Sequence, residues 1–383
     1  TGYLLEVYAN GEMPGYFKDF LNQIRDFESR GGTTFTTLDA ANTISGMSNV
    51  LTEAQNSSKI YKLYFGKLPH KRIAMSQQPA DNFGQAWATL IFMPFTAYLD
   101  GTLRSQIYGI RGGTSTFWKE VAAHEVSHEW WGHTVGWSSY HDQWMSEGFA
   151  QLSASLYIQA VKKDPKEFID FWEEQRRLIV DASPATRDKK PYTVGPVTQG
   201  YRLNSGRTGN VARYLIYPKG AYILHMLRMM MYDRKAGGDV EFIKMMKDFT
   251  ATHYNKDVST EDFKAIVQKH MTPKMDIDQN KTIDWFFDEW VYGTDVPAYK
   301  FEYSLNGDTL SGKLTQSGVS DNFVMLVPLY ADFGKGWIYL GNVTLAGNST
   351  LDIGELKLPQ APQKVAICAY NDVLATKIEN VKK

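Results

Sequence analysis

Hydrophobic residues recur at helical spacing through most of the chain between residues 39 and 293. The clearest case is the stretch 39–64, whose apolar face consists of Ile44, Met47, Val50, Leu51 and Ala54. The same periodicity predicts further helices over 116–135, 146–162, 221–232, 240–252, 260–270 and 282–292. Short apolar runs predict strands at 4–8, 71–75 and 86–92, although a buried helix fits the last run as well.

The pattern changes near Asp295-Val296-Pro297. Beyond this point apolar residues alternate with polar ones, and turn signals such as Asn306-Gly307 and Gly347-Asn348 separate the runs. Alternation with frequent turns is typical of a small antiparallel β-sandwich. We therefore expect an α+β protein with a first domain at 1–297 and a β-sandwich domain at 298–383.

Two stretches lack periodicity. Gly101 to Ser115 is polar and predicts a loop, and Thr116 is the expected N-cap of the helix that follows. Residues 181–212 are rich in Pro, Gly, Ser, Thr and Arg. A segment of this length without regular structure is either a substrate-facing lid or a solvated connector, and the pattern favours neither.

Composition and charge exclude several classes of protein. The 383 residues include 41 Lys+Arg and 42 Asp+Glu, so the net positive field typical of nucleic-acid-binding proteins is absent. The single cysteine, Cys368, cannot form an internal disulfide. The longest apolar candidate, 86–99, is interrupted by Pro94, so no membrane-spanning helix is expected. These features leave the oligomeric state open.

The most informative segment is His124-Glu125-Val126-Ser127-His128, which the pattern places on a helix. Histidines at positions i and i+4 share one helix face, so both imidazoles can bind one ion at about 2.0–2.1 Å. After eighteen further residues, Glu147 stands at the start of the next predicted helix and can supply a third ligand. This spacing is that of a catalytic zinc site of the gluzincin type, with a fourth position open for water.

The residues around these ligands suggest roles in hydrolysis. Zinc lowers the pKa of a bound water from 15.7 towards about 7, and Glu125, which points elsewhere around the helix, can act on that water as general base. Partners for the other ring nitrogens of the two histidines are needed, and the candidates are His133, His141, Asp142, Ser146 and Gln151. Each of these can equally be a cap, surface or packing residue. The neighbouring tryptophans either line a pocket or, as we favour, form an aromatic core; they are Trp130, Trp131, Trp137 and Trp144.

These motifs resemble those of a known family, the gluzincin aminopeptidases of the alanyl aminopeptidase and leukotriene-hydrolase type. The resemblance covers most of residues 40–300 and is carried by HEVSHEWWGH, DQWMSEGFA and YPKGAYILHML, with WFFDEWVYGTDVP as a weaker part. It implies a thermolysin-like zincin domain with a mostly helical lower lobe, followed by the β-sandwich. The implied parts are an N-terminal segment at 1–38, a zinc-site lobe at 39–165 and a helical lobe at 166–297. The resemblance also implies peptide substrates and makes Tyr217 the oxyanion donor beside zinc, with Tyr214 as the competing choice.

One motif of the family is altered. Its aminopeptidases carry a GxMEN segment whose glutamate binds the α-amine of the substrate. The matching place here is Asn82 to Trp87, with Gly84 in the glycine position and Gln85 in the position of the glutamate. An amide supplies no negative charge, and charge-assisted hydrogen bonds are about twice as strong as neutral ones. We expect Gly84 and Gln85 to contact substrate, with either weakened aminopeptidase action or a preference for internal or blocked peptide bonds.

Two further features concern the ends of the domain. Relatives place a large β-rich domain before the catalytic one, and since residues 1–38 are too few to form it and the chain begins at Thr1, we expect a piece of a longer protein. Whether that protein is exported to the periplasm or the medium stays open. Asp276 to Asp284 spaces oxygen side chains as in a calcium loop, but Lys281 takes the usual glycine position and Phe287 that of the closing glutamate. A polar turn that caps the next helix is favoured over a calcium site.

The sequence thus predicts a zinc metallopeptidase with one catalytic Zn²⁺ held by His124, His128 and Glu147, Glu125 as base and Tyr217 as oxyanion donor. Three alternatives remain open. The enzyme is an endopeptidase or cleaves blocked peptides; it hydrolyses a non-peptide bond such as an epoxide, as one branch of the family does; or the chain is a binding or scaffold protein on a retained zincin fold.

Overall fold

The computed structural model describes residues 2–30, 43–99, 117–162, 164–233 and 238–383. The predicted loop at Gly101 to Ser115 and the predicted N-cap Thr116 lie outside these residues. Helices and strands are both abundant, so the fold is α+β, as predicted. Within the described residues, no helix is long and apolar enough to cross a membrane. The chain divides into two compact units, which are described separately below.

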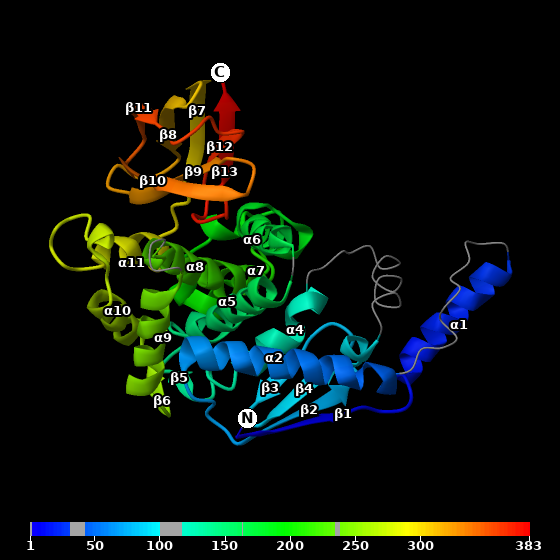
Figure 1. The fold of residues 1–383 in the computed structure, drawn as a ribbon. Helices are drawn as coiled ribbons and strands as arrows, with labels where there is room; N and C mark the ends of the chain where they lie inside the picture. The colour runs from blue at the N-terminus through cyan, green and yellow to red at the C-terminus, as the bar shows by residue number, and fades with distance from the viewer. Residues whose placement is uncertain (1, 31–42, 100–116, 163, 234–237) are drawn as a thin grey trace. The chain divides into compact units, whose positions relative to one another are not determined.

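The first unit comprises Thr1–Val135 and Ser153–Lys163 and is built on a four-stranded sheet. The strand order is β1-β2-β4-β3, with bounds Leu4–Tyr8, Arg72–Gln78, Leu90–Pro94 and Gln85–Trp87. Strands β1, β2 and β4 are parallel, whereas β3 pairs antiparallel with β4, so that Gln85 lies opposite Phe92. The antiparallel strand therefore places Gln85 at the border of the sheet. Figure 1 shows helix α2 lying along the sheet, and helix α1 (Gly15–Ser29) following β1.

Helix α2 (Met47–Phe65) confirms the greater part of the helix predicted over 39–64, and a 3₁₀ turn at Ile44–Gly46 comes before it. Residues 39–42 of that prediction lie outside the described residues. Val50, Ala54, Tyr61 and Phe65 are buried at helical spacing, as expected for an amphipathic helix. Ile44 and Leu51 were assigned to the same apolar face by their spacing but are 52% and 39% exposed. The apolar face is therefore narrower at its N-terminal end than the sequence pattern predicts.

Helix α4 (Phe117–Ser127) carries the HExxH segment and is fixed to α2. The Tyr61 hydroxyl donates a hydrogen bond of 2.8 Å to the carbonyl of Ala123. Beyond α4, Trp130 and Trp131 are fully buried against the rings of Tyr61 and Phe65. These two tryptophans form an aromatic core, as favoured from the sequence.

The second unit comprises Gly136–Leu152 and Asp164–Lys383. Its helices are α6 (Pro165–Val180), α7 (Val211–Tyr214), α8 (Gly220–Met231), α9 (Val240–Thr252), α10 (Thr260–Lys269) and α11 (Asp284–Trp290). Helix α5 (Trp144–Val161) is continuous through the division: its residues up to Leu152 belong to the second unit and the remainder to the first. The short strands β5 (Val135–Trp137) and β6 (Lys256–Val258) pair with each other.

Local side-chain signals explain where several of these helices begin. Asp164 caps α6 by accepting a hydrogen bond from the Lys166 amide, with Pro165 in the first helical position. Ser259 and Asp262 form a reciprocal capping box at α10. The stretch 181–212, which has no periodicity, contains three 3₁₀ helices: η4 (Pro184–Thr186), η5 (Pro191–Thr193) and η6 (Val197–Leu203).

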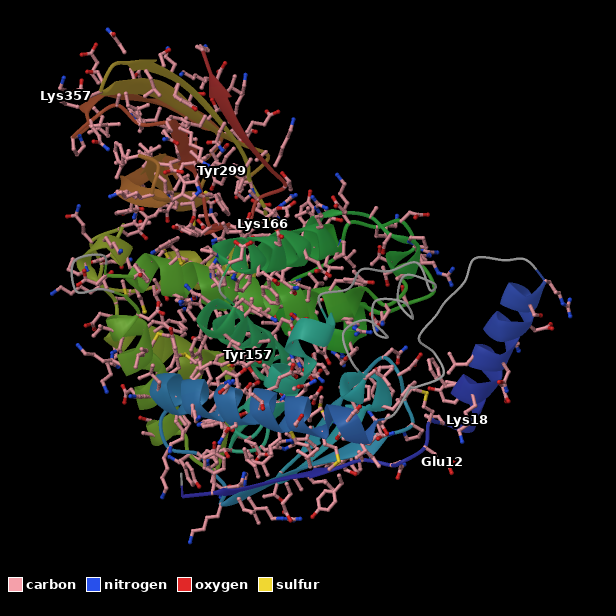
Figure 2. The ribbon with its side chains drawn as sticks, turned by 45° about the vertical axis from the view of Figure 1, so that its right-hand side comes forward. Glu12, Lys18, Tyr157, Lys166, Tyr299 and Lys357 are labelled. Atoms are coloured by element: carbon pink, nitrogen blue, oxygen red, sulfur yellow. The ribbon has the colours of Figure 1, made fainter. Side chains whose placement is uncertain are left out.

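Strands replace helices from Ala298 onward, as the alternation predicts. One sheet has the order β10-β9-β12, with bounds Trp337–Ala346, Val324–Asp332 and Lys364–Ile367. The other has the order β11-β8-β7-β13, with bounds Ser349–Lys357, Thr309–Ser317, Ala298–Asn306 and Lys377–Lys382. Tyr299, labelled in Figure 2, is buried and donates to Gln316 at 3.0 Å. The prediction of an antiparallel sandwich needs one correction, because β13 returns to pair parallel with β7.

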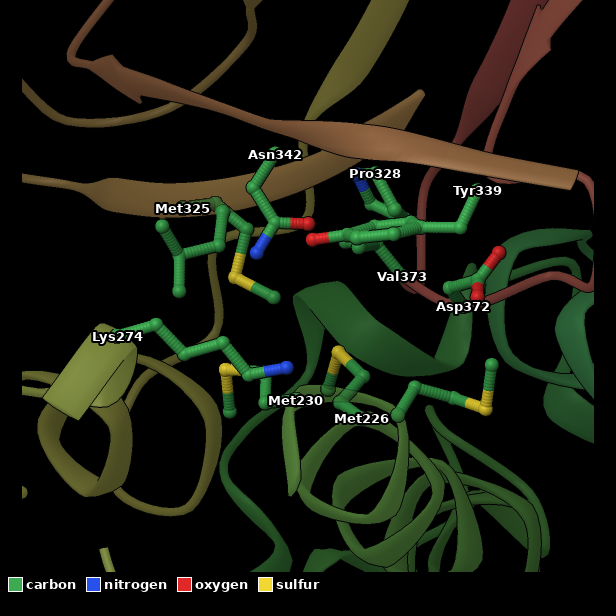
Figure 3. Close-up of a pocket in the computed structure, with 11 residues that line it drawn as sticks. Met226, Met230, Lys274, Met325, Pro328, Tyr339, Asn342, Asp372 and Val373 are labelled. Carbon is green, nitrogen blue, oxygen red and sulfur yellow. The ribbon is translucent and has the colours of Figure 1, made fainter. Parts of the chain in front are cut away.

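A small methionine-rich cavity lies within the second unit, between α8 and the strands β9 and β10. Met226, Met230, Met325 and Tyr339 line it, with the polar ends of Lys274 and Asp372 at its margin (Figure 3). Its volume is about 10 Å³, which is close to the space that a single water needs. None of the residues predicted for the zinc site lines this cavity, so it is separate from the predicted site.

Candidate active site

The two histidines of the HExxH segment face each other at the end of helix α4. His124 and His128 are both nearly buried, and their Nε2 atoms lie 3.3 Å apart. The sequence pattern predicts that this helix continues to residue 135. In the structure, helix α4 ends at Ser127. The amides of His128 and Trp130 bond the carbonyls three residues earlier, so the chain tightens into a turn. The i, i+4 relation of the two rings survives this change.

A chain of hydrogen bonds fixes the ring of His128. Its Nδ1 lies 2.9 Å from the carbonyl oxygen of Trp131, and because a carbonyl can only accept, Nδ1 carries the proton. The lone pair of Nε2 is therefore available to a metal. The indole of Trp131 in turn donates to Ser153 Oγ at 3.1 Å, on helix α5. Sequence reasoning sought side-chain partners for the ligands, but here the partner is a backbone carbonyl.

Glu147 lies in the first turn of the same helix α5. Ligand atoms of His124, His128 and Glu147 all lie within 4.8 Å of one another. Within the part of the chain that the structure describes, this is the one group of three or more His, Cys, Asp or Glu residues close enough to hold a metal ion. The three predicted ligands are therefore brought together.

The donor set fits zinc. Two ligands bound at about 2.0–2.1 Å to one tetrahedral ion are about 3.3 Å apart, which is the separation of the two Nε2 atoms. Two imidazoles with one carboxylate also form the His₂Glu set of catalytic zinc sites, which leaves the fourth position to water or substrate. His124, His128 and Glu147 can thus hold a single Zn²⁺ ion.

Glu125 lies against the loop before strand β3. Its side chain is nearly buried, and a Cβ atom added to Gly84 would lie only 2.5 Å from Glu125 Oε1 and 2.6 Å from its Cδ. The φ angle of Gly84 is not positive, so the glycine is required by the close approach of the carboxyl group rather than by its backbone conformation. The structure therefore places two residues predicted for the site, Gly84 and Glu125, in contact.

Gln85 follows Gly84 on the exposed edge strand β3. Its side-chain amide has one long hydrogen bond of 3.4 Å, to the carbonyl of Ala86. The same carbonyl accepts a 3.1 Å bond from His133 Nε2. His133 therefore supports the strand that carries Gln85, and its ring also meets that of the predicted ligand His128 edge-on, with ring centres 6.3 Å apart. Gln85 as a whole residue is exposed on this strand.

Tyr217 lies in a π-helical turn, Leu215–Lys219, that also contains Pro218. Proline has no N–H to donate, and widened helical turns of this kind are frequent at functional sites. Lys219 is fully buried, and its Nζ donates to the carbonyl of Gly293 at 3.0 Å. Burial lowers the pKa of Lys219 to about 8, and Asp295 opposes this. The lysine of the YPKGA motif thus ties the turn with Tyr217 to the loop after α11.

Two glycines bring this turn close to the helix of Glu147. A Cβ atom on Gly148 would lie 2.8 Å from the carbonyl carbon of Gly220, and one on Gly220 would lie 3.1 Å from Gly148 Cα. The backbones of α5 and α8 therefore touch at this point, where any side chain would separate them. Because Gly148 follows Glu147 and Gly220 follows Lys219, the contact sets the distance between the third ligand and Tyr217. Both motifs are evident in the sequence, but the packing of their glycines appears only in the folded chain.

The other candidates have structural roles. Asp142 accepts from the amide and hydroxyl of Thr260 at 2.7 and 2.9 Å and so caps α10. Gln151 donates to Gln175 of α6 at 3.2 Å, and His141 Nδ1 bonds the carbonyl of Thr198 at 2.8 Å. Ser146 is nearly buried in the first turn of α5. Trp144 is core, whereas Trp137 is 40% exposed.

The calcium-like loop folds as a polar turn. The carboxylate of Asp276 accepts from the Lys281 amide at 2.9 Å, and Asn280 accepts from the Thr282 amide at 2.8 Å. Asp284, the first residue of α11, pairs with Lys264 at 2.6 Å. Oxygen atoms of Asp276, Asn280 and Asp284 are thus engaged by the chain itself, in agreement with the favoured interpretation.

Two groups near the ligands were missed from the sequence. Glu129, directly after His128, is fully buried and contacts His70 Nδ1 at 2.6 Å and the Thr89 amide at 3.2 Å. Burial raises the pKa of Glu129 to about 7, although His70 opposes this. Burial raises the pKa of Tyr201 in η6, and the nearby charge of Glu147 raises it further. Neither has a sequence signal, because each partner lies far away along the chain.

Comparison with known proteins agrees with this geometry. The Peptidase family M1 domain matches residues 113–290. Aminopeptidase N of Lactococcus lactis subsp. lactis is 24% identical over 186 residues, which are 48% of this chain and 19% of that protein. Aminopeptidase A of Gloydius brevicauda is 29% identical over 143 residues, which are 37% of this chain and 14% of that protein. The chain thus spans about a fifth or less of the length of these relatives.

Among solved structures, the M1 zinc metallopeptidase from Deinococcus radiodurans has a TM-score of 0.44 and 20% identity, over 64% of this chain and 45% of that one. The two histidines and the glutamate of the site lie inside the residues that match the Peptidase family M1 domain. Residues 113–290 are thus similar to that domain.

Proposed function

We propose that this protein hydrolyses peptide bonds with one zinc ion and acts in the manner of an aminopeptidase. The observation that supports this most directly is the convergence of His124, His128 and Glu147. Glu125, beside Gly84, supplies a carboxylate next to that cluster. A bound zinc ion would supply a Lewis acid that polarises the substrate carbonyl and lowers the pKa of water.

In this proposal Glu125 is the general base. Its carboxyl group takes a proton from the attacking water and then gives it to the leaving amine. Contact with Gly84 restricts where the carboxyl group can lie, which favours a fixed distance to the reacting atoms. Glu125 is nearly buried, so little water surrounds its carboxylate. The dielectric constant there is low, which strengthens the electrostatic interactions of the carboxylate with the reacting groups.

Tyr217 donates a hydrogen bond to the oxyanion of the tetrahedral intermediate. Three features hold this tyrosine in place: the π-helical turn, the buried bond of Lys219 and the Gly148–Gly220 contact. A tyrosine with only a packing role would not need to be held this firmly. Loss of one such donor costs about 2.7–4 kcal/mol of transition-state stabilisation. Tyr214, the competing choice, lies in α7 one turn before Tyr217.

Gln85 contacts the amino end of the substrate. Without a carboxylate at this position, the α-ammonium gains a neutral hydrogen bond, so discrimination between free and blocked N-termini is weak. An endopeptidase or blocked-peptide hydrolase is the second candidate, and the replacement of glutamate by Gln85 is the observation that favours it. We also propose 1–297 as the catalytic domain and 298–383 as an accessory β-sandwich, since β7 begins at Ala298.

The test uses the zinc-loaded protein and its Glu125→Gln variant. Wild type is expected to cleave peptides, and the variant to keep one zinc per chain while losing about 10²–10⁴-fold in kcat. Glu355→Gln, on the exposed face of β11, is the control and should behave as wild type. A Glu125→Gln protein that retains activity contradicts the assignment of the base. A wild type that binds zinc but cleaves no member of a peptide library favours a binding or scaffold protein.

Matched peptides with free and N-acetylated termini decide the mode of cleavage. Mass spectrometry of the products should show single residues released from the free peptides. Equal cleavage of blocked peptides at internal bonds would identify an endopeptidase instead.

A further inference from the structure

Strand β3 is short, and its position depends on the turn that follows it. The strand has three residues and forms the border of its sheet, where it pairs with β4. In the turn between the two strands, Thr89 has φ +66°, in the left-handed region that β-branched residues rarely adopt. Such strain persists only where the surroundings fix the conformation of the residue, and it is most frequent at functional sites. The turn at Thr89 therefore needs a partner that holds it.

That partner is the carboxylate of Glu129, in the segment that follows helix α4. The two oxygens of Glu129 accept from the Thr89 amide at 3.2 and 3.4 Å. The carbonyl of Thr89 accepts from the Ala74 amide on β2 at 2.9 Å. Both backbone polar groups of Thr89 are thus paired, one with the sheet and the other with Glu129.

Glu129 is itself fixed in place. Its side chain is fully buried, and its Oε2 lies 2.6 Å from His70 Nδ1. Its backbone carbonyl accepts from Thr134 Oγ1 at 2.7 Å. Burial keeps water from competing for the carboxylate, so its bond to the Thr89 amide is stronger than one at the surface. Because Glu129 directly follows His128 in the chain, this bond joins the metal-binding segment to the end of β3.

A second hydrogen bond joins the same two parts of the fold. His133 Nε2 lies 3.1 Å from the carbonyl oxygen of Ala86, the central residue of β3. The strand is thus held at its middle by His133 and just beyond its end by Glu129. Gln85, the group proposed above to contact the amino end of the substrate, directly precedes Ala86, so both bonds influence where its side chain lies.

We propose that Glu129 is a positioning residue that holds strand β3, and with it the side chain of Gln85, at the amino end of the substrate. This inference rests on the proposed function, since it assigns a role in substrate recognition at the same site. Glu129 acts through the Thr89 amide and contacts no reacting atom. The role needs an acceptor oxygen rather than a negative charge, because the group to be held is a backbone N–H.

Two substitutions of similar size distinguish an acceptor from a packing group. Glu129→Gln keeps an oxygen for the Thr89 amide and an –NH₂ group for His70 Nδ1, so its KM for free peptides should equal that of wild type. Glu129→Met keeps the volume without the acceptor. It is expected to raise KM about fivefold, with kcat changed less than about twofold and zinc content unchanged, because one hydrogen bond to substrate is lost.

Two further variants strengthen this comparison. Thr134→Val removes the hydrogen bond to the Glu129 carbonyl but none to β3, so it is the matched control and should lower the thermal midpoint with KM as in wild type. If Glu129→Met does not fold, Glu129→Asp replaces it. Its carboxylate is one methylene further from the Thr89 amide, so KM should rise at least about twofold.

A double-mutant cycle with Gln85→Ala shows whether Glu129 acts through Gln85. In that case Glu129→Met raises KM no further in the Gln85→Ala protein. Effects on KM that add in the double variant overturn the inference. So does a lower thermal midpoint with unchanged KM, which marks a structural role alone, and so does a lower kcat with unchanged KM, which marks an effect on the chemical step.

Amide hydrogen exchange gives a readout without turnover. The Thr89 amide should exchange at least about tenfold faster in Glu129→Met than in wild type, whereas Glu129→Gln should exchange as wild type does. Unchanged exchange in Glu129→Met refutes the inference even in an active enzyme. Faster exchange in Glu129→Met, in a protein whose wild type cleaves no peptide, supports the hold on β3 and refutes the proposed function alone.

Discussion

The last turn of helix α4, with His128 directly after it, and the start of edge strand β3, with Gly84 directly before it, touch at Glu125 and Gly84. They differ in which of the predicted groups they retain. The turn carries two of the three predicted ligands and the predicted base, and the Nε2 atoms of His124 and His128 lie at a separation that fits one ion. The strand keeps the glycine that makes room for Glu125 but presents the amide of Gln85 where its resemblance to aminopeptidases calls for a carboxylate.

This difference separates reaction chemistry from substrate recognition. A metal ligand or a general base is constrained to a residue type by its lone pairs and its pKa, so substitution removes function. A recognition group contributes a graded interaction, so substitution shifts preference among substrates. We therefore expect changes in the turn to abolish activity and changes in the strand to redirect it.

Removal of a ligand from the turn should have the largest effect. His124→Ala is expected to lose most bound zinc and more than about a thousandfold in kcat/KM, because the Lewis acid is lost with the ligand. Metal analysis and peptide hydrolysis provide the measurement. Chelation should lower the thermal midpoint of wild type but not that of the variant, since only wild type is stabilised by bound metal.

His253→Ala, at the C-terminal end of α9, serves as the control for this change and should keep its zinc. A His124→Ala protein that binds one zinc per chain would show that the ion sits elsewhere.

A larger side chain at the contact between Gly84 and Glu125 should have the second largest effect on activity. In Gly84→Ala the new methyl group would lie 2.5 Å from Glu125 Oε1, so the carboxyl group must move. Since a displacement of about 1 Å can cost about a hundredfold in rate, kcat should fall by about that factor with zinc content unchanged. Gly206→Ala, whose Cβ would meet nothing within 4 Å, is the matched control. Wild-type rates in Gly84→Ala would contradict the role of the contact.

Restoring the carboxylate on the strand should have a smaller effect. Gln85→Glu is expected to raise the ratio of kcat/KM for free over N-acetylated peptides about tenfold, because a charge-assisted bond to the ammonium replaces a neutral one. Gln268→Glu, exposed on α10, changes net charge equally and should leave the ratio as in wild type. If this ratio is unchanged in Gln85→Glu, Gln85 does not contact the amino end of the substrate.

The same contrast explains what the sequence predicts about the site. The ligand pair follows from helical spacing, because four residues nearly complete one turn. The end of α4 does not follow from it: the Trp131 carbonyl turns back to His128 Nδ1, so the helix predicted to reach residue 135 stops at Ser127. Hydrophobic periodicity contains no information about a carbonyl recruited by a side chain.

Contacts between distant segments are the other part that periodicity cannot supply. The Gly148–Gly220 approach and the bond from Lys219 to Gly293 join residues more than seventy positions apart. Tyr201 belongs to a stretch with no periodicity at all, so only the folded chain shows that it lies near Glu147. The parallel pairing of β13 with β7 could not be predicted for the same reason. Alternation of apolar and polar residues indicates a strand, but it does not indicate which strand lies beside it.

A pH effect on stability has to be separated from the pH dependence of catalysis, and Glu289 provides the means. Burial raises the pKa of Glu289 from 4.5 to about 8, the nearby carboxylates of Asp278, Asp288 and Asp295 raise it, and the bond from the Val324 amide lowers it. A carboxyl group whose folded pKa is raised stabilises the fold at low pH, and this contribution is lost as pH rises from about 4.5 through about 8. The wild-type thermal midpoint should therefore fall more between about pH 6 and about pH 9 than that of Glu289→Gln.

At about pH 7 the two proteins should have equal kcat/KM, because no contact joins Glu289 to the turn or to the strand in the described residues. Parallel midpoints would show that Glu289 is ionised in the folded protein at neutral pH, and an alkaline loss of activity would then belong to the site itself.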